Sequence, residues 1–463
     1  MVIFGATGDL SQSKLIPSLF SLFKQQKLPS EFLIAGFARR NFSDDGFRKL
    51  FKTSPEFSKH LIYQQGEFQN KEGYFALAKK LEDFDKKMGA CVTRFFYLAT
   101  PPGHYEVILN FLHSTKLSEG CGHTGSKWTR IIIEKPFGKD LETAKALDAK
   151  LCQIFEEKQI FRVDHYLGKE TVQNMLAFRF ANGIFEPVWN KNFVDHVQIT
   201  FAEEEGVAGR AQFFEGVGIL RDVGQNHLMQ LLAAVAMDQP KSFTKEALRD
   251  ARAAVVKSIR NIDPSEVHKY VVRAQHKGHR SEEGVAKDST TETFVAMKLF
   301  VDSERFANVP FYLRAGKRMA KNTVEISVVF IQTCHILFKE YGCPEIGNTL
   351  TFRIQPNEGI SLRIIAKKPG SKLSLETVDM KFTYKEGFGT KGLDAYQKVL
   401  LDIFAGDQML FNRSDELESS WALITNILKG WERKKSKLFE YTALSWGPKE
   451  ADELIEKDGR KWL

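Results

Sequence analysis

The beginning of the chain alternates short apolar runs with helical patterns, and this alternation limits the possible folds more than any other feature of the sequence. The predicted strands are residues 2–4, 32–37, 94–100 and 130–134, and the predicted helices are residues 10–23, a segment through Tyr105 and Leu112, and a segment from about Leu141. Strands and helices that alternate at these lengths form crossover units on a parallel sheet. We therefore expect a Rossmann-type domain, with a parallel sheet and helices on both faces.

The pattern changes from about Phe161, because predicted strands then follow one another directly. Helices are predicted over residues 168–180 and 218–237, and strands over residues 196–201, 294–300, 324–330, 350–354, 361–366 and 373–384. Successive strands favour a mostly antiparallel sheet with helices to one side. We expect two domains, residues 1–163 and residues 164–463, the second being a larger α+β domain. The polar stretch 276–289 is predicted to be a surface loop.

Composition and charge exclude several classes of protein. The chain of 463 residues carries 66 Lys and Arg against 58 Asp and Glu, a net charge of +8 that is spread along the sequence. No block of like charges resembles a nucleic-acid-binding arm, and no apolar run approaches the roughly 18 residues that span a bilayer. Five scattered cysteines, none of them at metal-ligand spacing, predict free thiols and a reducing compartment. We therefore expect a cytoplasmic protein, or one inside an organelle after processing, that binds no metal, nucleic acid or membrane.

A glycine-containing turn separates the first predicted strand from the first predicted helix. Gly5 permits a tight turn there, and Gly8 lets backbone N–H groups approach a pyrophosphate at the helix N-terminus. Ser11 replaces the third glycine of the usual pattern, so an ordinary strand–helix turn stays open as an alternative. The predicted dinucleotide contacts are Gly5, Thr7, Gly8, Asp9 and Leu10.

Two arginines, Arg39 and Arg40, follow the second predicted strand. An acidic residue at this position would bind the ribose hydroxyls of NAD, whereas an arginine suits the 2′-phosphate of NADP. Arg39 is the predicted contact, Arg40 is a second candidate, and a solvated basic pair is the alternative. The predicted cofactor is therefore NADP.

Two further segments combine side chains that can do chemistry. Residues 162–170 place an aspartate, a histidine, a tyrosine and a lysine just before an amphipathic helix, and three of these types can donate hydrogen bonds to a phosphate. In residues 220–228, His227 follows Asp222 by five positions on a helix that otherwise looks like core. The alternatives are a capped helix start and a buried structural histidine, and only a partner carboxylate would make His227 a plausible base.

These two segments, together with five other stretches of the chain, resemble the glucose-6-phosphate dehydrogenase family. The stretches that carry the resemblance span almost the whole chain in the family's order, and they are residues 5–10, 134–138, 162–170, 221–227, 313–317, 355–358 and 404–417. Residues 162–170 are the most specific of them. The resemblance implies oxidation of glucose 6-phosphate at C1 to 6-phosphogluconolactone with NADP, the first step of the oxidative pentose phosphate pathway. It also implies an NADP-binding domain over residues 1–163 and a substrate-binding and dimerisation domain over residues 164–463.

The resemblance further implies a role for each candidate residue. His227 and Asp164 would form a catalytic dyad, in which His227 accepts the proton of the C1 hydroxyl and Asp164 orients the imidazole. The implied phosphate contacts are His165, Tyr166 and Lys169, and the implied contacts to the rest of the substrate are Glu203, Asp222, Lys317, Gln355 and Lys135, the last of which would also touch the cofactor. The resemblance also implies that this chain assembles as a homodimer or a dimer of dimers.

One departure from the family pattern and two rival interpretations stay open. A second basic residue is expected five positions after Lys317, where this chain has Asn322, so either Lys321 replaces it or one substrate contact is missing. The rival enzyme is another sugar or polyol dehydrogenase with a Rossmann-type domain, which would not need the cluster in residues 164–169. The non-catalytic alternative is an NADP-binding regulatory protein, which would have no reason to keep both Asp164 and His227.

Overall fold

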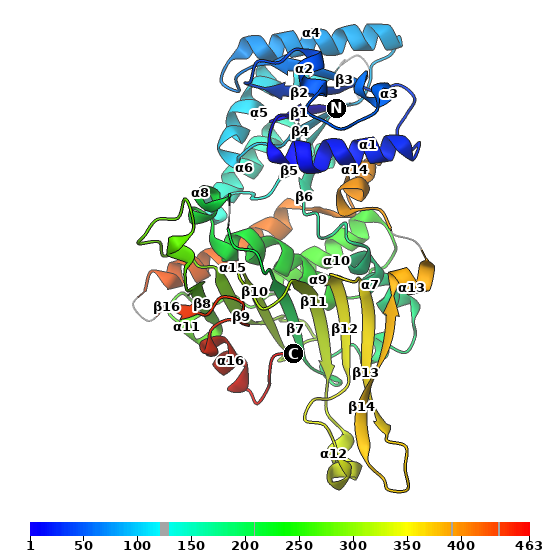
Figure 1. Ribbon diagram of the computed structural model, residues 1–463, viewed down its shortest axis with the longest axis vertical. Helices are drawn as coiled ribbons and strands as arrows, with labels where there is room; N and C mark the ends of the chain where they lie inside the picture. The colour runs from blue at the N-terminus through cyan, green and yellow to red at the C-terminus, as the bar shows by residue number, and fades with distance from the viewer. Residues whose placement is uncertain (121–128, 208, 390–391, 434–435) are drawn as a thin grey trace. The chain divides into compact units, whose positions relative to one another are not determined.

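The computed structural model describes residues 1–120, 129–207, 209–389, 392–433 and 436–463 (Figure 1). The chain divides into two compact units. The first unit contains Met1–Gly168 and Leu393–Ser414, and the second contains Lys169–Gly392 and Asp415–Leu463. The chain therefore returns to the first unit for one short segment before it completes the second.

A seven-stranded sheet forms the centre of the first unit, in the order β15-β6-β5-β4-β1-β2-β3. Its strands are β1 (Val2–Phe4), β2 (Ile34–Ala38), β3 (Leu61–Gln65), β4 (Arg94–Leu98), β5 (Thr129–Glu134), β6 (Ile160–Val163) and β15 (Phe411–Asn412). Every neighbouring pair is parallel except β15 and β6. β1 and β2 are buried along their whole length, as apolar strands are when both faces of a parallel sheet are covered. The expected Rossmann-type sheet is confirmed.

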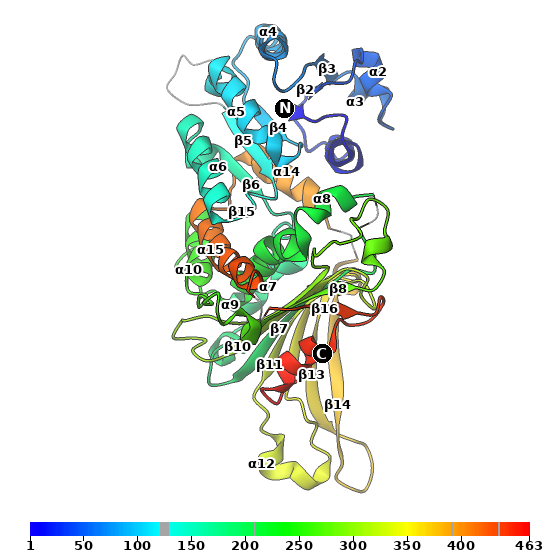
Figure 2. The same cartoon turned by 90° about the vertical axis from the view of Figure 1, so that its left-hand side faces the viewer.

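Helices cover both faces of this sheet (Figure 2). The α-helices are α1 (Ile16–Lys24), α2 (Asp44–Arg48), α3 (Pro55–Ser58), α4 (Lys71–Met88), α5 (Tyr105–Ser114), α6 (Leu141–Ile154) and α14 (Ala395–Ala405). Shorter helical turns are η1 (Ser11–Leu15), η2 (Pro102–His104), η3 (Leu117–Glu119) and η4 (Glu157–Gln159). α1 packs on α14, whereas α5 packs beside α4 and α6. α1 buries Ile16, Leu19 and Leu22 in one core cluster with Ile3 of β1 and Ile34 of β2, so its apolar face packs against the sheet.

The second unit is built on a nine-stranded sheet in the order β14-β13-β12-β11-β7-β10-β9-β8-β16. Its strands are β7 (Val194–Ala202), β8 (Val271–His276), β9 (Phe294–Phe300), β10 (Pro310–Gly316), β11 (Thr323–Phe330), β12 (Thr349–Gln355), β13 (Gly359–Lys367), β14 (Leu375–Thr383) and β16 (Leu438–Tyr441). β10 pairs in parallel with β7, and β16 with β8, while the other pairs are antiparallel. The expected larger domain with a mostly antiparallel sheet is confirmed.

Helices pack on this second sheet, with α7 against β12 and η6 against β7, β9 and β10. The helices are α7 (Glu170–Ala181), η5 (Glu186–Val188), α8 (Ala211–Glu215), η6 (Leu220–Leu228), α9 (Met229–Ala236), α10 (Lys245–Lys257), α11 (Val267–Tyr270), η7 (His279–Ser281), α12 (Cys334–Phe338), η8 (Lys339–Tyr341), α13 (Tyr384–Phe388), α15 (Ser414–Trp431) and α16 (Lys449–Glu456). The strand β14 at the sheet edge leaves Val378 and Met380 exposed. That strand therefore has apolar side chains available for a partner.

The helix predicted over residues 218–237 is confirmed, and its first part is a π-helix, η6, that continues into the α-helix α9. The structure corrects one local expectation. The stretch 276–289, predicted to be a surface loop, buries both of its histidines and Ser289. These side chains are buried because they interact with nearby carboxylates. Ser289 Oγ, for example, donates a hydrogen bond to Glu215 Oε1 at 2.8 Å.

The expectation of free thiols is wrong for Cys334 and Cys343, which form a disulfide. Their Cα atoms lie 5.8 Å apart, a separation that a disulfide can bridge. Cys152 is an exposed free thiol, and Cys121 lies outside the described residues. Among the helices of the described residues, none has the length and apolar character needed to cross a membrane.

Candidate active site

The turn between β1 and η1 has the geometry of a phosphate-binding turn. Gly5 adopts φ +82°, and a Cβ there would lie 2.4 Å from the carbonyl oxygen of Ala99, so the position requires glycine. Gly8 N donates to Gly5 O at 2.9 Å. Ser11 is buried and its Oγ donates to Gly5 O at 3.1 Å. The hydroxyl of Ser11 therefore ties the start of the helix to the turn, in the place of the usual third glycine.

The other predicted cofactor contacts lie on the same sheet edge. Thr7 is nearly buried, and its carbonyl accepts a hydrogen bond from Gln12 Nε2 at 2.8 Å, while Asp9 is exposed and Leu10 half-buried. Arg39 is exposed directly after β2, the parallel neighbour of β1. Because neighbouring parallel strands end at the same edge of the sheet, Arg39 lies at the same edge as the glycine turn that follows β1. The cradle and an adjacent cation suit a phosphorylated dinucleotide.

Lys135 follows β5, and Glu134, the residue before it, has a buried carboxyl group. Tyr97 Oη donates to Glu134 Oε1 at 2.5 Å, and Tyr105 Oη donates to the Glu134 carbonyl at 2.9 Å. Burial raises the pKa of Glu134 to about 7, against the opposing effects of the Tyr97 hydrogen bond and the Lys135 charge. Lys135 itself is half-buried. Tyr97 therefore holds the side chain of Glu134, and Tyr105 holds the backbone carbonyl that directly precedes Lys135.

The segment after β6 holds three of the predicted residues. Asp164 and Tyr166 are buried, and Asp164 Oδ1 accepts a hydrogen bond from Tyr166 N at 3.0 Å. His165 is half-buried, and its ring stacks on Tyr396 of α14 with centroids 5.8 Å apart. The returning segment thus supplies a wall beside His165 that sequence reasoning did not identify. Lys169 stands at the N-cap of α7 in the second unit.

Three of the predicted sugar contacts come together in the second unit. Lys317 Nζ forms an ion pair with Glu203 and lies 3.9 Å from Asp222 Oδ2. The pair with Glu203 follows from strand register, because Glu203 follows β7 and Lys317 follows β10, where Ala202 lies opposite Gly316. Two carboxylates and an ammonium group can accept from and donate to sugar hydroxyls. The arrangement therefore suits a polyhydroxylated ligand.

His227 and Asp222 lie on η6, and the π-helical form changes how they are related. Residues five apart on an α-helix point about 140° apart, whereas a π-helix closes its hydrogen bonds between residues five apart. Both side chains are buried. The His227 ring stacks on Phe201 of β7, with centroids 5.8 Å apart and planes at 7°, and Asn226 Oδ1 accepts from His227 N at 2.6 Å. The imidazole of His227 is thus held on the same buried helix as the Asp222 carboxylate.

The two positions left open by the sequence lie close to Glu203. Asn322 Oδ1 accepts a hydrogen bond from Glu204 N at 2.9 Å, and Lys321 Nζ lies over the Trp446 ring, 5.4 Å from its centroid. Both side chains are therefore engaged within the protein, which favours the absence of the second basic contact. Gln355 is half-buried at the end of β12.

Comparison with known families covers nearly the whole chain. Residues 2–174 match the family profile described as "Glucose-6-phosphate dehydrogenase, NAD binding domain". Residues 176–463 match the profile described as "Glucose-6-phosphate dehydrogenase, C-terminal domain". The chain belongs to the glucose-6-phosphate dehydrogenase family.

Relatives within this family align along their full length. The glucose-6-phosphate 1-dehydrogenase of Chlamydia pneumoniae is 42% identical over 490 aligned positions, which cover 100% of this chain and 95% of the relative. That of Borreliella burgdorferi is 41% identical over 478 positions, covering 99% of this chain and 97% of the relative. A solved glucose-6-phosphate dehydrogenase in complex with its substrate glucose-6-phosphate superposes with a TM-score of 0.90 at 34% identity, covering 100% of this chain and 98% of that one. The Mycobacterium avium enzyme gives 0.84 at 32% identity with the same coverage.

Glu292 is a buried carboxyl group of this family member that sequence reasoning missed. Its Oε1 accepts a hydrogen bond from Leu220 N at 3.1 Å, at the first residue of η6. Gly218, with φ +70°, passes so close that a Cβ would lie 2.2 Å from Glu292 Oε1. Burial raises the pKa of Glu292 to about 7. Glu292 therefore anchors the beginning of the helix that carries Asp222 and His227.

This anchor gives a testable pH dependence of stability. Because the folded pKa is raised above the ordinary 4.5, the folded state holds a proton that the unfolded state releases, and the contribution of Glu292 to stability falls as the pH rises from 4.5 through about 7. Above that range the buried charge costs up to about 3 kcal/mol. Glu292→Gln, whose amide oxygen can still accept from Leu220 N, should match the parent in thermal midpoint at pH 5 and exceed it at pH 8. The exposed Glu283→Gln is the control, and a Glu292→Gln midpoint below the parent's at pH 8 would contradict the assignment.

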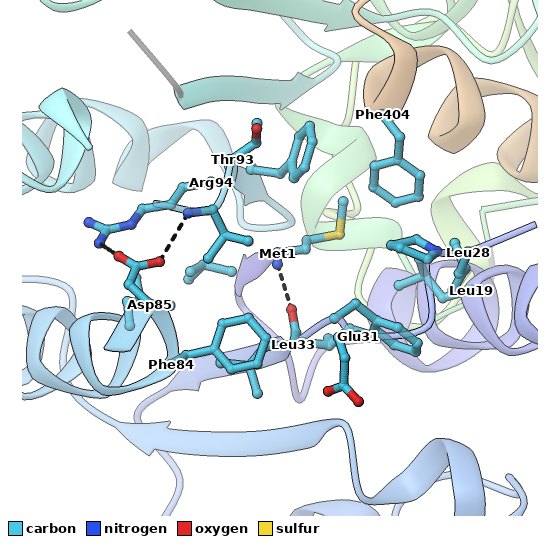
Figure 3. A pocket seen from close by; sticks show the side chains of 17 residues that line it. Met1, Leu19, Leu28, Glu31, Leu33, Phe84, Asp85, Thr93, Arg94 and Phe404 are labelled. Atoms are coloured by element: carbon cyan, nitrogen blue, oxygen red, sulfur yellow. Dashed lines mark hydrogen bonds and ion pairs between the residues drawn. The ribbon is translucent and has the colours of Figure 1, made fainter. Parts of the chain in front are cut away.

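A pocket of about 390 Å³ beside Met1 contains none of the predicted site residues (Figure 3). Its walls are mostly apolar, from Leu19, Leu28 and Phe404 among others. Its charged groups include the ion pair between Arg94 and Asp85, at 2.6 Å. A closed ion pair in an apolar wall offers no group for sugar oxidation, so we place the chemistry of the dehydrogenase elsewhere.

Proposed function

We propose that this oxidoreductase oxidises glucose 6-phosphate at C1 with NADP as the hydride acceptor, and so catalyses the first step of the oxidative pentose phosphate pathway. Membership of the family and the full-length relatives support the substrate. The single structural observation that carries the proposal is the cluster of Glu203, Asp222 and Lys317 beside the helix of His227. A rival polyol dehydrogenase would have no need for the phosphate contacts proposed in residues 164–169 and would not account for the family match.

The first unit is proposed to hold NADP. The fit is supported by Gly5, where a Cβ would strike Ala99 and where only a bare backbone can line the turn. Gly5, Thr7, Gly8, Asp9 and Leu10 would line the pyrophosphate, and Arg39 would pair with the 2′-phosphate. The bound nicotinamide supplies the acceptor for the hydride of C1.

Separate groups of residues are proposed to bind the phosphate and the sugar ring of glucose 6-phosphate. His165, Tyr166 and Lys169 would donate to the 6-phosphate, since each can offer a hydrogen bond and Lys169 adds a positive charge. The contacts proposed for the sugar are Glu203, Asp222, Lys317, Gln355 and Lys135. Holding the non-reacting phosphate would convert its binding free energy into correct placement of C1.

Proton removal is assigned to His227. Imidazole titrates near neutral pH, so it can accept the proton of the C1 hydroxyl as the C1–H bond breaks. Asp164 would hold the imidazole in one tautomer and stabilise its positive form. The general-base role also accounts for a histidine fixed by ring stacking and a backbone hydrogen bond within the second unit.

One assay tests the proposed function as a whole. Purified protein is mixed with glucose 6-phosphate and either NADP or NAD, and the absorbance of the reduced nicotinamide is followed. We expect steady reduction of NADP with glucose 6-phosphate, and far slower reduction with glucose or a polyol. Equal rates with a polyol, or no reduction of either cofactor, would reject the proposal.

Arg39→Ala should shift cofactor preference towards NAD. Loss of a charge-assisted contact to the 2′-phosphate should raise the KM for NADP by about 10- to 100-fold and leave the KM for NAD nearly unchanged. The two KM values are measured at saturating glucose 6-phosphate. Arg40→Ala tests the second candidate for this contact, and an unchanged NADP-to-NAD ratio in Arg39→Ala would remove Arg39 as the phosphate contact.

Two further assignments complete the proposal. Assembly as a homodimer, or a dimer of dimers, is supported by the exposed apolar side chains of β14, including Val378 and Met380. A cytoplasmic location is supported by the metabolic substrate and by the composition of the chain, although the Cys334–Cys343 disulfide is a bond that reducing compartments disfavour.

A further inference from the structure

A group of two buried histidines and a glutamate lies in the second unit, outside the residues assigned above. His276 ends β8, His279 opens η7, and Glu282 follows η7. A ring nitrogen of each histidine and a carboxylate oxygen of Glu282 all lie within 4.8 Å of one another. His276 is 4% exposed and His279 is 0% exposed. Three potential ligand atoms therefore face one another in a buried space.

The hydrogen bonds of the two histidines determine which ring nitrogens face that space. His276 Nδ1 lies 3.2 Å from the carbonyl oxygen of Lys277, so this nitrogen must carry the proton in order to donate. His279 Nε2 lies 3.2 Å from Glu215 Oε1 and must likewise donate. The opposite nitrogens, His276 Nε2 and His279 Nδ1, are buried and make no hydrogen bond within the part of the chain that the structure describes. In the neutral rings these two nitrogens carry lone pairs.

The carboxylate of Glu282 faces both lone pairs. Its Oε1 is 3.5 Å from His276 Nε2, and its Oε2 is 4.0 Å from His279 Nδ1. Glu282 Oε2 also accepts from Val207 N at 3.1 Å, and Arg318 Nε lies 3.5 Å from Oε1. His276 Nε2, His279 Nδ1 and the anchored Glu282 carboxylate therefore offer three converging ligand atoms to a cation.

We propose that His276 Nε2, His279 Nδ1 and the Glu282 carboxylate bind one Zn²⁺ ion, with water as the fourth ligand. Zinc bonds of about 2.0–2.2 Å to nitrogen and oxygen place tetrahedral ligands about 3.3 Å apart. The observed 3.5 Å separation of His276 Nε2 and Glu282 Oε1 is close to that value, and the ligand atoms that lie up to 4.8 Å apart need to close by up to about 1.5 Å. Imidazole ligands select zinc over the oxygen-preferring Mg²⁺ and Ca²⁺.

The surroundings match those of a metal-binding histidine pair. A ligating histidine usually donates its other ring N–H to a carboxylate or a backbone carbonyl, which fixes the tautomer. Glu215 supplies the carboxylate for His279, and the Lys277 carbonyl serves His276. Glu215 is itself held by Ser289 Oγ at 2.8 Å. The sequence signal for this proposed site is the pattern His-x-x-His-x-x-Glu in residues 276–282.

The proposed ion would stiffen the turn that carries Lys317. His276 N donates to Thr293 Oγ1 at 2.9 Å, and Lys317 N donates to the Thr293 carbonyl at 2.9 Å. Tyr441 Oη donates to the Lys317 carbonyl at 2.5 Å, and the Tyr441 ring contacts the His276 ring with centroids 6.1 Å apart. The zinc ligand His276 thus shares two neighbours with Lys317, so the ion is a structural support of this turn.

The test is a direct measurement of metal binding. Untagged protein carrying Cys152→Ser, which removes the exposed thiol, is treated with a chelator and titrated with Zn²⁺ in equilibrium dialysis. We expect one Zn²⁺ per chain, no binding of Mg²⁺ or Ca²⁺ at the same concentrations, and a rise in the thermal midpoint with Zn²⁺. His279→Gln and Glu282→Gln should weaken binding by at least about a hundredfold, and Glu215→Gln by about ten- to a hundredfold. His113→Gln, an exposed histidine of the first unit, should bind as the parent does.

Two measurements on the parent chain keep the proposal testable if a variant fails to fold. Co²⁺ should bind in competition with Zn²⁺ and give the intense visible bands of a four- or five-coordinate site. Nitrogen NMR of the metal-free protein should show a proton on Nδ1 of His276 and on Nε2 of His279. Absence of saturable Zn²⁺ binding, binding unchanged in His279→Gln and Glu282→Gln, or the opposite tautomers would each overturn the proposal.

Discussion

Replacement of His227 by asparagine is expected to lower kcat for glucose 6-phosphate by about a hundred- to ten-thousand-fold, the usual contribution of a positioned general base. Asparagine keeps the size and polarity of the buried side chain but cannot accept the proton of the C1 hydroxyl. The KM for glucose 6-phosphate should change little, because the proposed phosphate contacts are untouched. Steady-state kinetics with NADP measure both constants.

The matched control for this variant is His196→Asn. His196 is also buried, on β7 of the same unit, and its Nδ1 lies 2.6 Å from Asp195 Oδ2. Its replacement should lower the thermal midpoint but leave kcat near the parent value. A His227→Asn variant with near-normal turnover would remove His227 as the base.

Lys169→Ala is expected to raise the KM for glucose 6-phosphate by about 10- to 150-fold, because a charged hydrogen bond to phosphate contributes about 1.5–3 kcal/mol. The slower oxidation that we expect for free glucose, which has no phosphate to hold, should change little. The measurement is therefore the ratio of kcat/KM for the two sugars in parent and variant. Loss of both activities to the same degree would show that Lys169 acts on something other than the phosphate.

The exposed Lys191 provides the control for charge alone. Lys191→Ala removes the same charge from the second unit at a place with no proposed contact to the substrate. It should leave both KM values unchanged at moderate salt, where exposed charges are screened. A rise in the KM for glucose 6-phosphate in Lys191→Ala equal to that in Lys169→Ala would point to a general field effect.

The parallel sheet of the first unit could be predicted because its central strands are short, continuous apolar runs. β3 and α4 were not predicted. β3 is an edge strand that buries only alternate residues, and α4 is rich in charged side chains, so neither stands out from its neighbours. The return of Leu393–Ser414 to the first unit depends on contacts such as Arg130 with the carbonyl of Phe404, at 2.8 Å. Pairings this far apart in the chain leave no local pattern.

The candidate site was accessible to sequence reasoning where one segment holds several chemical groups. Residues 162–170 and 220–228 are of this kind, and the Lys317–Glu203 pair follows once both strands are placed. The π-helical form of η6 was not accessible, because a helical periodicity does not distinguish hydrogen bonds between residues four and five apart. Glu292 and Tyr396 were missed for a related reason. Their roles come from neighbours distant in sequence, Leu220 N and the His165 ring.

The central claim is that Asp164 and His227 act as one catalytic unit, and a double-mutant cycle on kcat tests it most directly. Asp164→Asn, His227→Asn and the double variant are compared with the parent at saturating glucose 6-phosphate and NADP. If Asp164 acts only through the imidazole, the double variant should be no slower than His227→Asn alone. Losses in the two single variants that multiply in the double variant would contradict the account.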